Sequence, residues 1–487
     1  MMKTCIIQVL DEVNIKLVNL DADVRRKLAS KFNYDVPGAR YMPAVRLGRW
    51  NGKESFFSIA GSTYLNLLPE IIPILEKEGY DFELDDKRQS HRQFHFDPVS
   101  ETTFDNRCWP SGHPIADQPI VLRDYQVSAI NSFLANPQCL QELPTAFGKT
   151  ISCAALSATV EKYGRTLIIV PNKSLVSQTL EDYVNMGLDT GVYCGDKKEL
   201  GKTHTICTWQ ALNVMLKNTQ AGTIETTIHE FIEGVVCVIV DECHQLRANA
   251  LKALLTGPFA NIPIRWGLTG TIPKEQYEFM SLFCSIGQVI GRLSAKELQD
   301  EGHLSNCHIN IIQLADHSEF KDYQKELKFL TENSDRLDEI AKIIDKIKSS
   351  GNTLVLVDRV ASGKEIVARL GEDAVFVSGS TKSKNRKEEY DSISNSDGKV
   401  IVATYGVAST GINIPRLFNI VLIEPGRSFV RCIQSIGRGL RKAADKNHVE
   451  IYDITSTCRF SKRHLAKRIQ YYKDAQYPYS KEKLEWR

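Results

Sequence analysis

Two short strings constrain this chain more than any other part of it: LPTAFGKT at residues 143–150 and VIVDECH at residues 238–244. The first follows a short strand-like stretch and precedes ISCAALSATVEKYG, a run compatible with a helix. A strand, a loop and a helix in this order place backbone N–H groups at a helix N-terminus, where they bind phosphate. The second ends an apolar run in two adjacent carboxylates, and open α/β sheets carry catalytic carboxylates at the carboxyl ends of such strands. The pair therefore predicts an α/β fold with parallel strands.

The residue types in these strings also indicate a chemistry. Lys149 is expected to reach the β- and γ-phosphates of a nucleotide, and Asp241 to lie on the metal side of the site. Glu242 is expected to orient or deprotonate the attacking water. Gly-Lys-Thr alone is equally typical of an ordinary turn into a helix, but its pairing with Asp-Glu-Cys-His favours a site for ATP and Mg²⁺. The predicted nucleotide contacts in the loop are Thr145, Gly148, Lys149 and Thr150, with the Thr150 hydroxyl and Asp241 as metal ligands.

Further motifs follow in order from residue 122 to residue 441, and with them the chain resembles the superfamily 2 helicases. LRDYQ at 122–126 is similar to their adenine-recognition motif, which implies that Arg123 frames the base and Gln126 contacts its edge. VPNKSLVSQ and CTWQAL resemble the strand-tracking motifs of the first motor domain, which implies phosphate contacts through Thr208 and Gln210. Either string alone is equally typical of a plain strand-to-helix turn. GLTGT at 267–271 stands where these helicases couple hydrolysis to the nucleic-acid groove.

The C-terminal half resembles the second motor domain of the same superfamily. VFVSGSTKSKNRKEEY, VIVATYGVASTGINIP and QSIGRGLR carry this resemblance. It implies that Arg438 and Arg441 face the γ-phosphate, with Arg441 as an arginine finger, a device that contributes about a thousandfold or more in rate. The alternative for these arginines is a solvated helix face. The other implied contacts are Gly411, Asn413 and Gln434 for the nucleotide, and Ser378 and Thr404 for strand phosphates.

The chain departs from the family pattern at two places. Ala146 and Phe147 stand where the phosphate loop more often has glycine and a small residue, so this loop loses some conformational freedom. Asn413 stands where many relatives carry aspartate, which weakens the expectation of a ribose or metal-side contact there.

Composition agrees with an intracellular multidomain enzyme. The 487 residues allow about three domains, and 42% hydrophobic content suits packed cores. The 12 cysteines form no C-x-x-C pair, which favours reduced thiols over zinc or disulfides. No run of 18 apolar residues occurs, and the N-terminus turns acidic too soon for a signal peptide. We therefore expect a soluble cytoplasmic protein with no membrane partner, in the bacterial host cytoplasm if a phage encodes it.

Basic residues are concentrated near the N-terminus, although the net charge of the whole chain is only +2. Residues 25–53 carry eight Lys and Arg against the single acid Asp35. Residues 50–53, Trp-Asn-Gly-Lys, predict a hairpin turn between two strands that presents Arg46, Arg49 and Lys53 to a duplex backbone. The alternative is that the aromatic residues of this stretch fill a small core while the basic residues form a solvated face.

The string RYMPAVRLGRWNGK, followed by LNLLPEIIPILEKEGYDFEL, resembles the N-terminal domain of phage UvsW-type branch-migration helicases. The resemblance implies a small α/β domain that contacts duplex DNA, followed by two RecA-like motor domains with parallel sheets. The expected limits are 1–92 for the small domain, 93–118 for a linker, 119–302 for the first motor domain and 303–487 for the second.

The function implied is an ATP-dependent DNA helicase that unwinds or branch-migrates junctions and forks as a monomer. Three alternatives stay open. An RNA helicase would share every motor motif, and a duplex translocase would move along DNA without separating strands. A silent DNA-binding scaffold is disfavoured because Lys149, Asp241, Glu242, Arg438 and Arg441 are all present.

Overall fold

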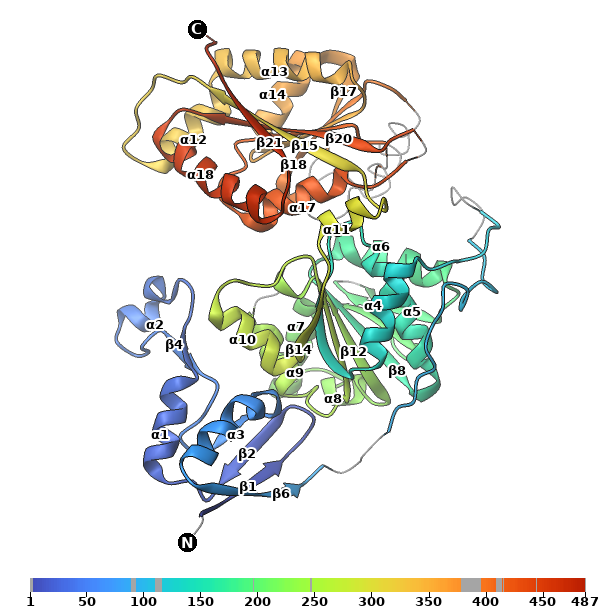
Figure 1. The fold of residues 1–487 in the computed structure, drawn as a ribbon, viewed down its shortest axis with the longest axis vertical. Helices are drawn as coiled ribbons and strands as arrows, with labels where there is room; N and C mark the ends of the chain where they lie inside the picture. Colours follow the sequence, from blue (N-terminus) through green and yellow to red (C-terminus); the bar gives the residue numbers. More distant parts are fainter. Residues whose placement is uncertain are drawn as a thin grey trace. The chain divides into compact units, whose positions relative to one another are not determined.

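The structure is a computed structural model that describes residues 3–88, 93–109, 116–195, 197–245, 248–377, 396–408, 414, 416–443 and 445–486. The chain divides into two compact units. The first combines Met1–Leu143 with Gly148–Arg292, and the second combines Pro144–Phe147 with Leu293–Arg487. Figure 1 follows the chain through both units. Within the described residues, no helix has the length and apolarity needed to cross a bilayer.

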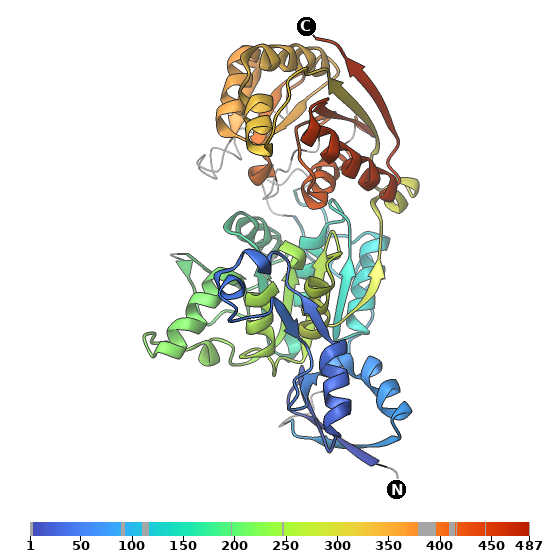
Figure 2. The same ribbon diagram turned by 90° about the vertical axis from the view of Figure 1, so that its left-hand side faces the viewer.

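The first unit is built on an eight-stranded sheet in the order β10-β9-β11-β8-β12-β13-β7-β14. Its inner strands pair in parallel, and β12 is buried at every position of VVCVIVD. Such continuous apolar strands are typical of parallel sheets covered by helices on both faces, as Figures 1 and 2 show for this unit. The strands are β7 (Gln138–Glu142), β8 (Arg165–Val170), β9 (Thr190–Cys194), β10 (Lys197–Lys198), β11 (His204–Thr208), β12 (Val235–Asp241), β13 (Ile264–Thr269) and β14 (Gln288–Arg292). The helices are α4 (Asp124–Leu134), α5 (Lys149–Val160), α6 (Lys173–Asn185), α7 (Trp209–Ala221), α8 (Ile228–Phe231), α9 (Ala248–Thr256) and α10 (Gln276–Ser285).

The N-terminal domain has a smaller mixed sheet in the order β5-β2-β1-β6. Strand β1 pairs antiparallel with β2 and parallel with β6. Its helices bury apolar side chains, with Leu28 in α1 and Ile71 and Leu75 in α3 almost fully enclosed. The elements are β1 (Lys3–Val9), β2 (Asn14–Val18), α1 (Ala22–Lys31), β5 (Ser62–Tyr64), α3 (Leu68–Lys77) and β6 (Tyr80–Asp86).

The N-terminal domain shares one hydrophobic core with α10 of the first motor domain. Tyr277 and Met280 of α10 lie in the same buried cluster as Phe56. Beside this cluster, Lys252 of α9 forms an ion pair with Glu54, and its ammonium lies 4.4 Å from the centroid of the Phe56 ring. Lys252 is only 9% exposed, so its charge is stabilised by a carboxylate and an aromatic face together. The two parts of this unit are therefore joined by a packed seam.

Residues 93–109, which fall in the expected linker, pack on the first motor domain. Phe94 and Phe96 lie with ring centroids 5.2 and 5.4 Å from that of Tyr163. The backbone N–H of Val99 donates to the Asn131 side chain at 2.8 Å, and that side chain donates back to the Val99 carbonyl at 2.9 Å. This part of the chain is a strap held by aromatic contacts and hydrogen bonds. The domain limits given above stay predictions.

The second unit has a seven-stranded sheet in the order β17-β18-β16-β19-β20-β15-β21, with every neighbouring pair parallel. A fully buried Arg336 joins its parts by ion pairs to Asp316 and Glu424. The predicted α/β fold, with two parallel-sheet domains after a small N-terminal α/β domain, is confirmed. The strands are β15 (Asn306–Leu314), β16 (Thr353–Val357), β17 (Ala374–Val377), β18 (Val400–Thr404), β19 (Asn419–Ile423), β20 (His448–Ser456) and β21 (Tyr479–Leu484). The helices are α11 (Ala295–Asp300), α12 (Tyr323–Glu332), α13 (Ser334–Lys348), α14 (Val360–Leu370), α16 (Tyr405–Ala408), α17 (Phe429–Gly439) and α18 (Arg459–Asp474).

The predicted hairpin at residues 50–53 is wrong. Strands β3 (Asn33–Asp35) and β4 (Lys53–Ser55) do pair antiparallel, but the chain between them forms the short helix α2 (Pro43–Arg46). Proline is favoured at the first helical position because a backbone N–H there would have no acceptor within the helix, so its absence costs no hydrogen bond. Arg46 therefore ends a helical turn and Arg49 follows it in a loop, so neither lies on a strand. We call residues 36–52 the arm.

Candidate ATP-hydrolysis site and nucleic-acid interface

The phosphate loop has the predicted strand, loop and helix. Strand β7 ends at Glu142, and α5 begins at Lys149 after Gly148, whose φ of 91° is left-handed. The N–H of Leu143 donates to the Thr269 carbonyl at 2.8 Å, which ties the loop to β13. Ala146 also has a left-handed φ, 73°, which costs about 1–2 kcal/mol for a residue with a Cβ. The departure from glycine at this position therefore adds backbone strain to the loop.

The carboxylates lie next to the phosphate-loop lysine. Asp241 is the last residue of β12, and Glu242 follows it with a left-handed φ of 48°. The Lys149 ammonium lies 3.1 Å from Glu242 Oε1 and donates to the Leu143 carbonyl at 3.3 Å. Lys149 and Asp241 are buried, at 8% and 4% exposure. The two strings singled out in the sequence thus meet in one enclosed site.

The surroundings of Asp241 and Glu242 shift the pKa values of these two carboxyl groups in opposite directions. Burial and the neighbouring Glu242 carboxylate raise the pKa of Asp241 to about 7. Burial acts in the same direction on Glu242, but the charges of Lys149 and His244 outweigh it and hold the pKa of Glu242 below its usual value. Glu242 is therefore kept as a carboxylate that can accept a proton, while Asp241 is a buried group whose charge needs a cation.

These residues fit the predicted magnesium ion. The ammonium of Lys149 pairs with Glu242, and Asp241 accepts a hydrogen bond from the Glu242 N–H at 2.9 Å. A divalent cation beside Asp241 would neutralise this buried carboxylate, and Thr150 in the first turn of α5 supplies a hydroxyl. Among the described residues, no group of three or more His, Cys, Asp or Glu side chains could hold a metal. Magnesium in nucleotide sites uses one or two carboxylates plus phosphates and water, so it needs no such group.

The GLTGT string contacts the second string directly. The His244 ring Nδ1 lies 2.5 Å from the Thr269 hydroxyl, which donates to the Thr271 carbonyl at 2.9 Å. The Gly270 N–H donates to Glu242 Oε2 at 3.3 Å. The chain then continues into α10, which packs in the N-terminal domain core. Hydrogen bonds near Glu242 and the chain segment that follows them therefore connect this carboxylate to a helix of that core.

The predicted adenine contact lies beside the phosphate loop. Gln126 lies in the first turn of α4 as part of a capping box, in which its Oε1 accepts the Arg123 N–H at 3.0 Å. A Cβ on residue 148 would lie 2.4 Å from Nε2 of Gln126, so this amide faces the loop. The Arg123 guanidinium donates to the Tyr125 hydroxyl, which fixes both side chains.

Gly148→Ala is expected to raise KM for ATP and to lower the free energy of unfolding by about 1–3 kcal/mol, because it adds left-handed strain and displaces Gln126. Gly187→Ala is the matched control, since Gly187 also has a positive φ but no atom lies within 4 Å of its added Cβ. ATPase kinetics and denaturant unfolding measure both effects. An unchanged KM in Gly148→Ala would contradict the proximity of Gln126 to the nucleotide.

The second unit carries the predicted arginines at the end of α17. Arg438 is 8% exposed, and Arg441 follows the helix, half-buried. The ammonium of Lys446 donates to the carbonyls of Gly439 and Arg441, and the Ser305 hydroxyl donates to the latter at 3.3 Å. No sequence motif indicated Lys446 or Ser305, which hold the backbone of Arg441 in place. Gly411, Asn413 and Ser378 lie outside the described residues, as does the Gln434 side chain.

The strand-tracking residues lie at the carboxyl ends of their strands. Thr208 ends β11 and caps α7, where its hydroxyl accepts the Ala211 N–H at 3.4 Å. Gln210 is exposed and donates to the Pro171 carbonyl at 3.0 Å, which joins the two predicted motifs. Thr404 ends β18 in the second unit.

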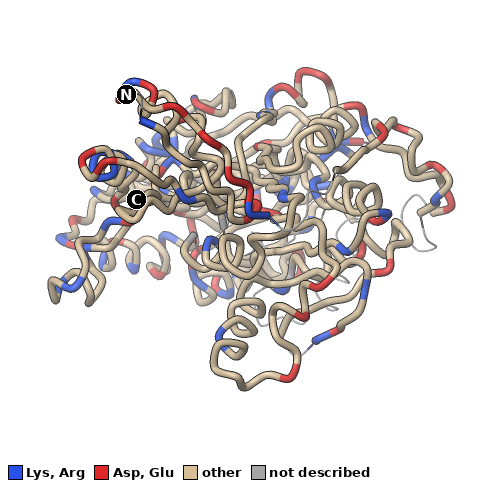
Figure 3. The backbone as a smooth tube through the Cα atoms, turned by 90° about the horizontal axis from the view of Figure 1, so that it is seen from below, with Lys and Arg blue, Asp and Glu red and all other residues tan. Residues whose placement is uncertain are grey.

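The arm is an exposed surface that combines positive charge with apolar groups. Arg46 and Arg49 are exposed, and neither has a carboxylate within 4 Å among the described residues. Lys53 is different, because it lies 3.6 Å from Asp35. Tyr41 and Leu47 are 61% and 63% exposed in the same segment. Figure 3 shows that basic and acidic residues are otherwise interspersed along the chain.

Comparison with known proteins agrees with these motifs. Residues 119–274 match the family model described as type III restriction enzyme, res subunit, and residues 335–443 match the helicase conserved C-terminal domain. The chain is 26% identical over 460 residues to the ATP-dependent DNA helicase uvsW of Enterobacteria phage T4, which covers 90% of this chain and 88% of that protein.

Two solved structures share the fold. The ATP-dependent Type ISP restriction-modification enzyme LlaBIII bound to DNA has a TM-score of 0.57 at 13% identity, covering 86% of this chain and 36% of that one. The DUF1998 helicase MrfA bound to DNA and AMPPNP has a TM-score of 0.57 at 16% identity, covering 80% and 56%. Its motifs stand in the order of the superfamily 2 helicases, the two family models match its two motor regions, and along most of its length the chain is similar to the phage T4 helicase uvsW.

Proposed function

We propose that this chain is an ATP-dependent DNA helicase that unwinds or branch-migrates junctions and forks. The observation that carries the proposal is the buried contact of Lys149 with Glu242. The neighbouring strand β13 is followed by α10, which packs in the core of the N-terminal domain. The similarity to a phage DNA helicase along 90% of the chain supports DNA as the substrate. We propose further that the protein acts as a monomer, in the cytoplasm where its DNA is found.

In the proposed hydrolysis step, Lys149 leaves Glu242 to bind the β- and γ-phosphates. Glu242 then orients the attacking water and accepts its proton, which is the role of a carboxylate general base. A magnesium ion, when bound at Thr150 and Asp241, would neutralise phosphate charge. Arg441 is proposed to stabilise the charge that builds on the transferred phosphoryl group, with Arg438 beside it. The remaining nucleotide contacts proposed are Arg123, Gln126, Thr145, Gly148, Gly411, Asn413 and Gln434.

Movement along DNA would follow if this hydrolysis step were coupled to two DNA-contacting surfaces. Thr208, Gln210, Ser378 and Thr404 are proposed to contact phosphates of one strand, and the arm to hold the duplex at a junction. The contacts from His244 through Thr269 to α10 offer a route by which the state of Glu242 reaches the arm-bearing domain. The exposed apolar groups of the arm suit the terminal base pair of a fork.

ATPase activity with different nucleic acids tests the choice of substrate. Forked or four-way DNA is expected to stimulate hydrolysis more than RNA duplexes of the same length. Stronger stimulation by RNA would favour the RNA-helicase alternative. Displacement of a triplex-forming strand without any unwinding would favour a duplex translocase.

Removing the arm charges, as Arg46→Ala with Arg49→Ala, is expected to weaken junction binding and to lower the slope of log Kobs against log salt by about two, since each lost phosphate contact removes about 0.9. Arg26→Ala with Lys27→Ala is the matched control, because these residues already pair with Asp23 and Glu78. Binding titrations at several salt concentrations measure both. Equal slopes for the two double variants would contradict a role of the arm in DNA binding.

A further inference from the structure

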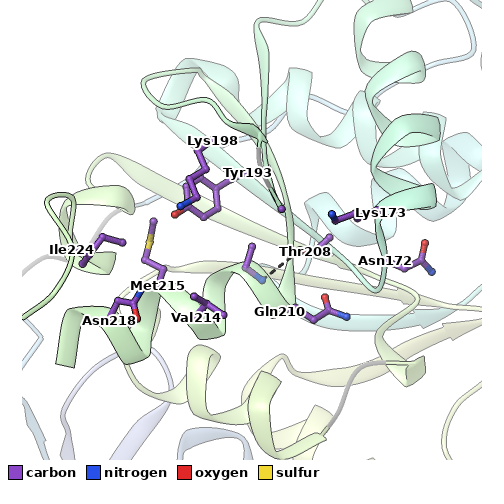
Figure 4. Close-up of a pocket in the computed structure, with 12 residues that line it drawn as sticks. Asn172, Lys173, Tyr193, Lys198, Thr208, Gln210, Val214, Met215, Asn218 and Ile224 are labelled. Atoms are coloured by element: carbon purple, nitrogen blue, oxygen red, sulfur yellow. Dashed lines mark hydrogen bonds between the residues drawn. The ribbon is translucent and has the colours of Figure 1, made fainter. Parts of the chain in front are cut away.

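A pocket of about 500 Å³ lies beside the strand-tracking motifs of the first unit. Its apolar lining comes from Tyr193 of β9, Val214 and Met215 of α7, and Ile224 (Figure 4). Ligand sites of this size are typically apolar with a few polar groups that orient the ligand. Here the polar groups are Asn172, Lys173, Lys198, Thr208, Gln210 and Asn218.

The N-termini of two helices and the Lys173 ammonium give one rim of the pocket a positive potential. Helices α6 and α7 begin beside it, capped by Asn172 and Thr208, and neither helix has an acidic residue in its first turn. A Cβ on Gly195 would lie 2.4 Å from Nζ of Lys173, so this ammonium lies against the turn between β9 and β10. No carboxylate is among the described residues that line the pocket. In Figure 4, Asn172 and Lys173 lie at one end, while Asn218 and Ile224 lie at the other.

We infer that this pocket holds one unstacked nucleobase of the bound strand, with the adjoining phosphates at the Asn172 and Lys173 rim. A nucleotide has an anionic group and a flat apolar ring with polar edges, and the pocket offers matching surfaces in that order. The Asn218 amide carries both a donor and an acceptor, which suits a base edge at the end opposite Asn172 and Lys173 (Figure 4). The inference rests on the proposed function, because it names what the strand-tracking surface grips.

One wall of the pocket belongs to the hydrophobic core that also holds the carboxylate motif. Met215 forms part of this wall and lies in the same buried cluster as Cys243 of the motif and Leu251 of α9. Helix α7 packs on α9, the helix that follows this motif. A base in the pocket would therefore contact a helix that shares its buried core with the carboxylate motif.

The test compares binding of an oligothymidylate with binding of the same strand made abasic, which keeps its phosphates and loses its bases. Wild-type protein is expected to bind the abasic strand at least about tenfold more weakly. Val214→Trp fills the pocket and should bring the ratio of the two affinities near one while leaving affinity for the abasic strand unchanged. Val184→Trp is the control, because Val184 on α6 is 58% exposed against 55% for Val214 and lies outside the pocket.

Stimulation of the wild-type ATPase by DNA shows whether a negative result concerns the nucleobase pocket alone or the proposed helicase function as well. If DNA stimulates hydrolysis but wild type binds the two strands with equal affinity, the proposal of a nucleobase in this pocket is wrong and the proposed function stands. The pocket is also overturned if Val214→Trp keeps the wild-type ratio. If no DNA stimulates hydrolysis, the proposed function fails and the inference fails with it.

Discussion

Replacing Glu242 with glutamine is expected to lower kcat for ATP hydrolysis by about a hundredfold to ten-thousandfold, with ATP affinity within a few-fold of wild type. Glutamine keeps the shape of the side chain and its contact with the Gly270 N–H, which glutamate accepts at 3.3 Å. It has no negative charge, so it cannot take a proton from water or pair with Lys149, whose ammonium lies 3.1 Å away. Single-turnover hydrolysis and nucleotide binding measure the two quantities separately.

The control for this variant is Glu233→Gln, an exposed carboxylate before β12. It makes the same chemical change outside the site and should leave kcat within about twofold, as surface substitutions usually do. Hydrolysis by Glu242→Gln at more than a tenth of the wild-type rate would remove Glu242 from the role of base. Loss of ATP binding would instead indicate a role in holding the nucleotide.

Arg441→Ala is expected to lower kcat by about a thousandfold, because an arginine finger acts on charge that develops only in the transition state. Its backbone is held by Lys446 at 2.9 Å and by Ser305, so the substitution should leave α17 in place. Arg438 is a poorer target because it is 8% exposed, and its removal would also damage packing. Steady-state ATPase assays and ATP-analogue binding give the split between kcat and affinity.

The neighbouring Lys442→Ala serves as the control for Arg441→Ala. Lys442 is exposed, and replacing it with alanine removes one positive charge from the same segment. The ATPase activity of Lys442→Ala is therefore expected to stay within about twofold of wild type. If both variants lose activity equally, the effect is one of local charge and not of a finger. If Arg441→Ala stays within fivefold of wild type, the finger must be sought elsewhere.

The hydrolysis site was predictable because its residues lie next to secondary-structure boundaries. Lys149 begins a helix and Asp241 ends a strand, and both boundaries follow from local patterns of apolar and glycine residues. Parallel topology then brings such strand ends to the same edge of the sheet. The order of these elements therefore predicts that the two strings meet, whereas the contact of Lys149 with Glu242 appears only in the structure.

The seam between the N-terminal domain and the motor was not predictable, because it depends on contacts between residues far apart in sequence. Lys252 is separated from Glu54 and Phe56 by most of the first unit, and nothing in its neighbours marks it as buried. The predicted hairpin turn in the arm was wrong for a different reason. An Asn-Gly turn signal and a proline helix start compete within a few residues there, and Pro43 decided the outcome.

We propose that ATP hydrolysis at Lys149 and Glu242 drives the processing of branched DNA. The most direct test of this proposal is ATP-dependent conversion of synthetic four-way junctions and forks, with Lys149→Ala as the inactive enzyme. Wild type is expected to convert junctions only with ATP and magnesium, and Lys149→Ala is expected to bind junctions without converting them. Junction conversion by Lys149→Ala, or unwinding of RNA duplexes by wild type with no activity on DNA junctions, would contradict it.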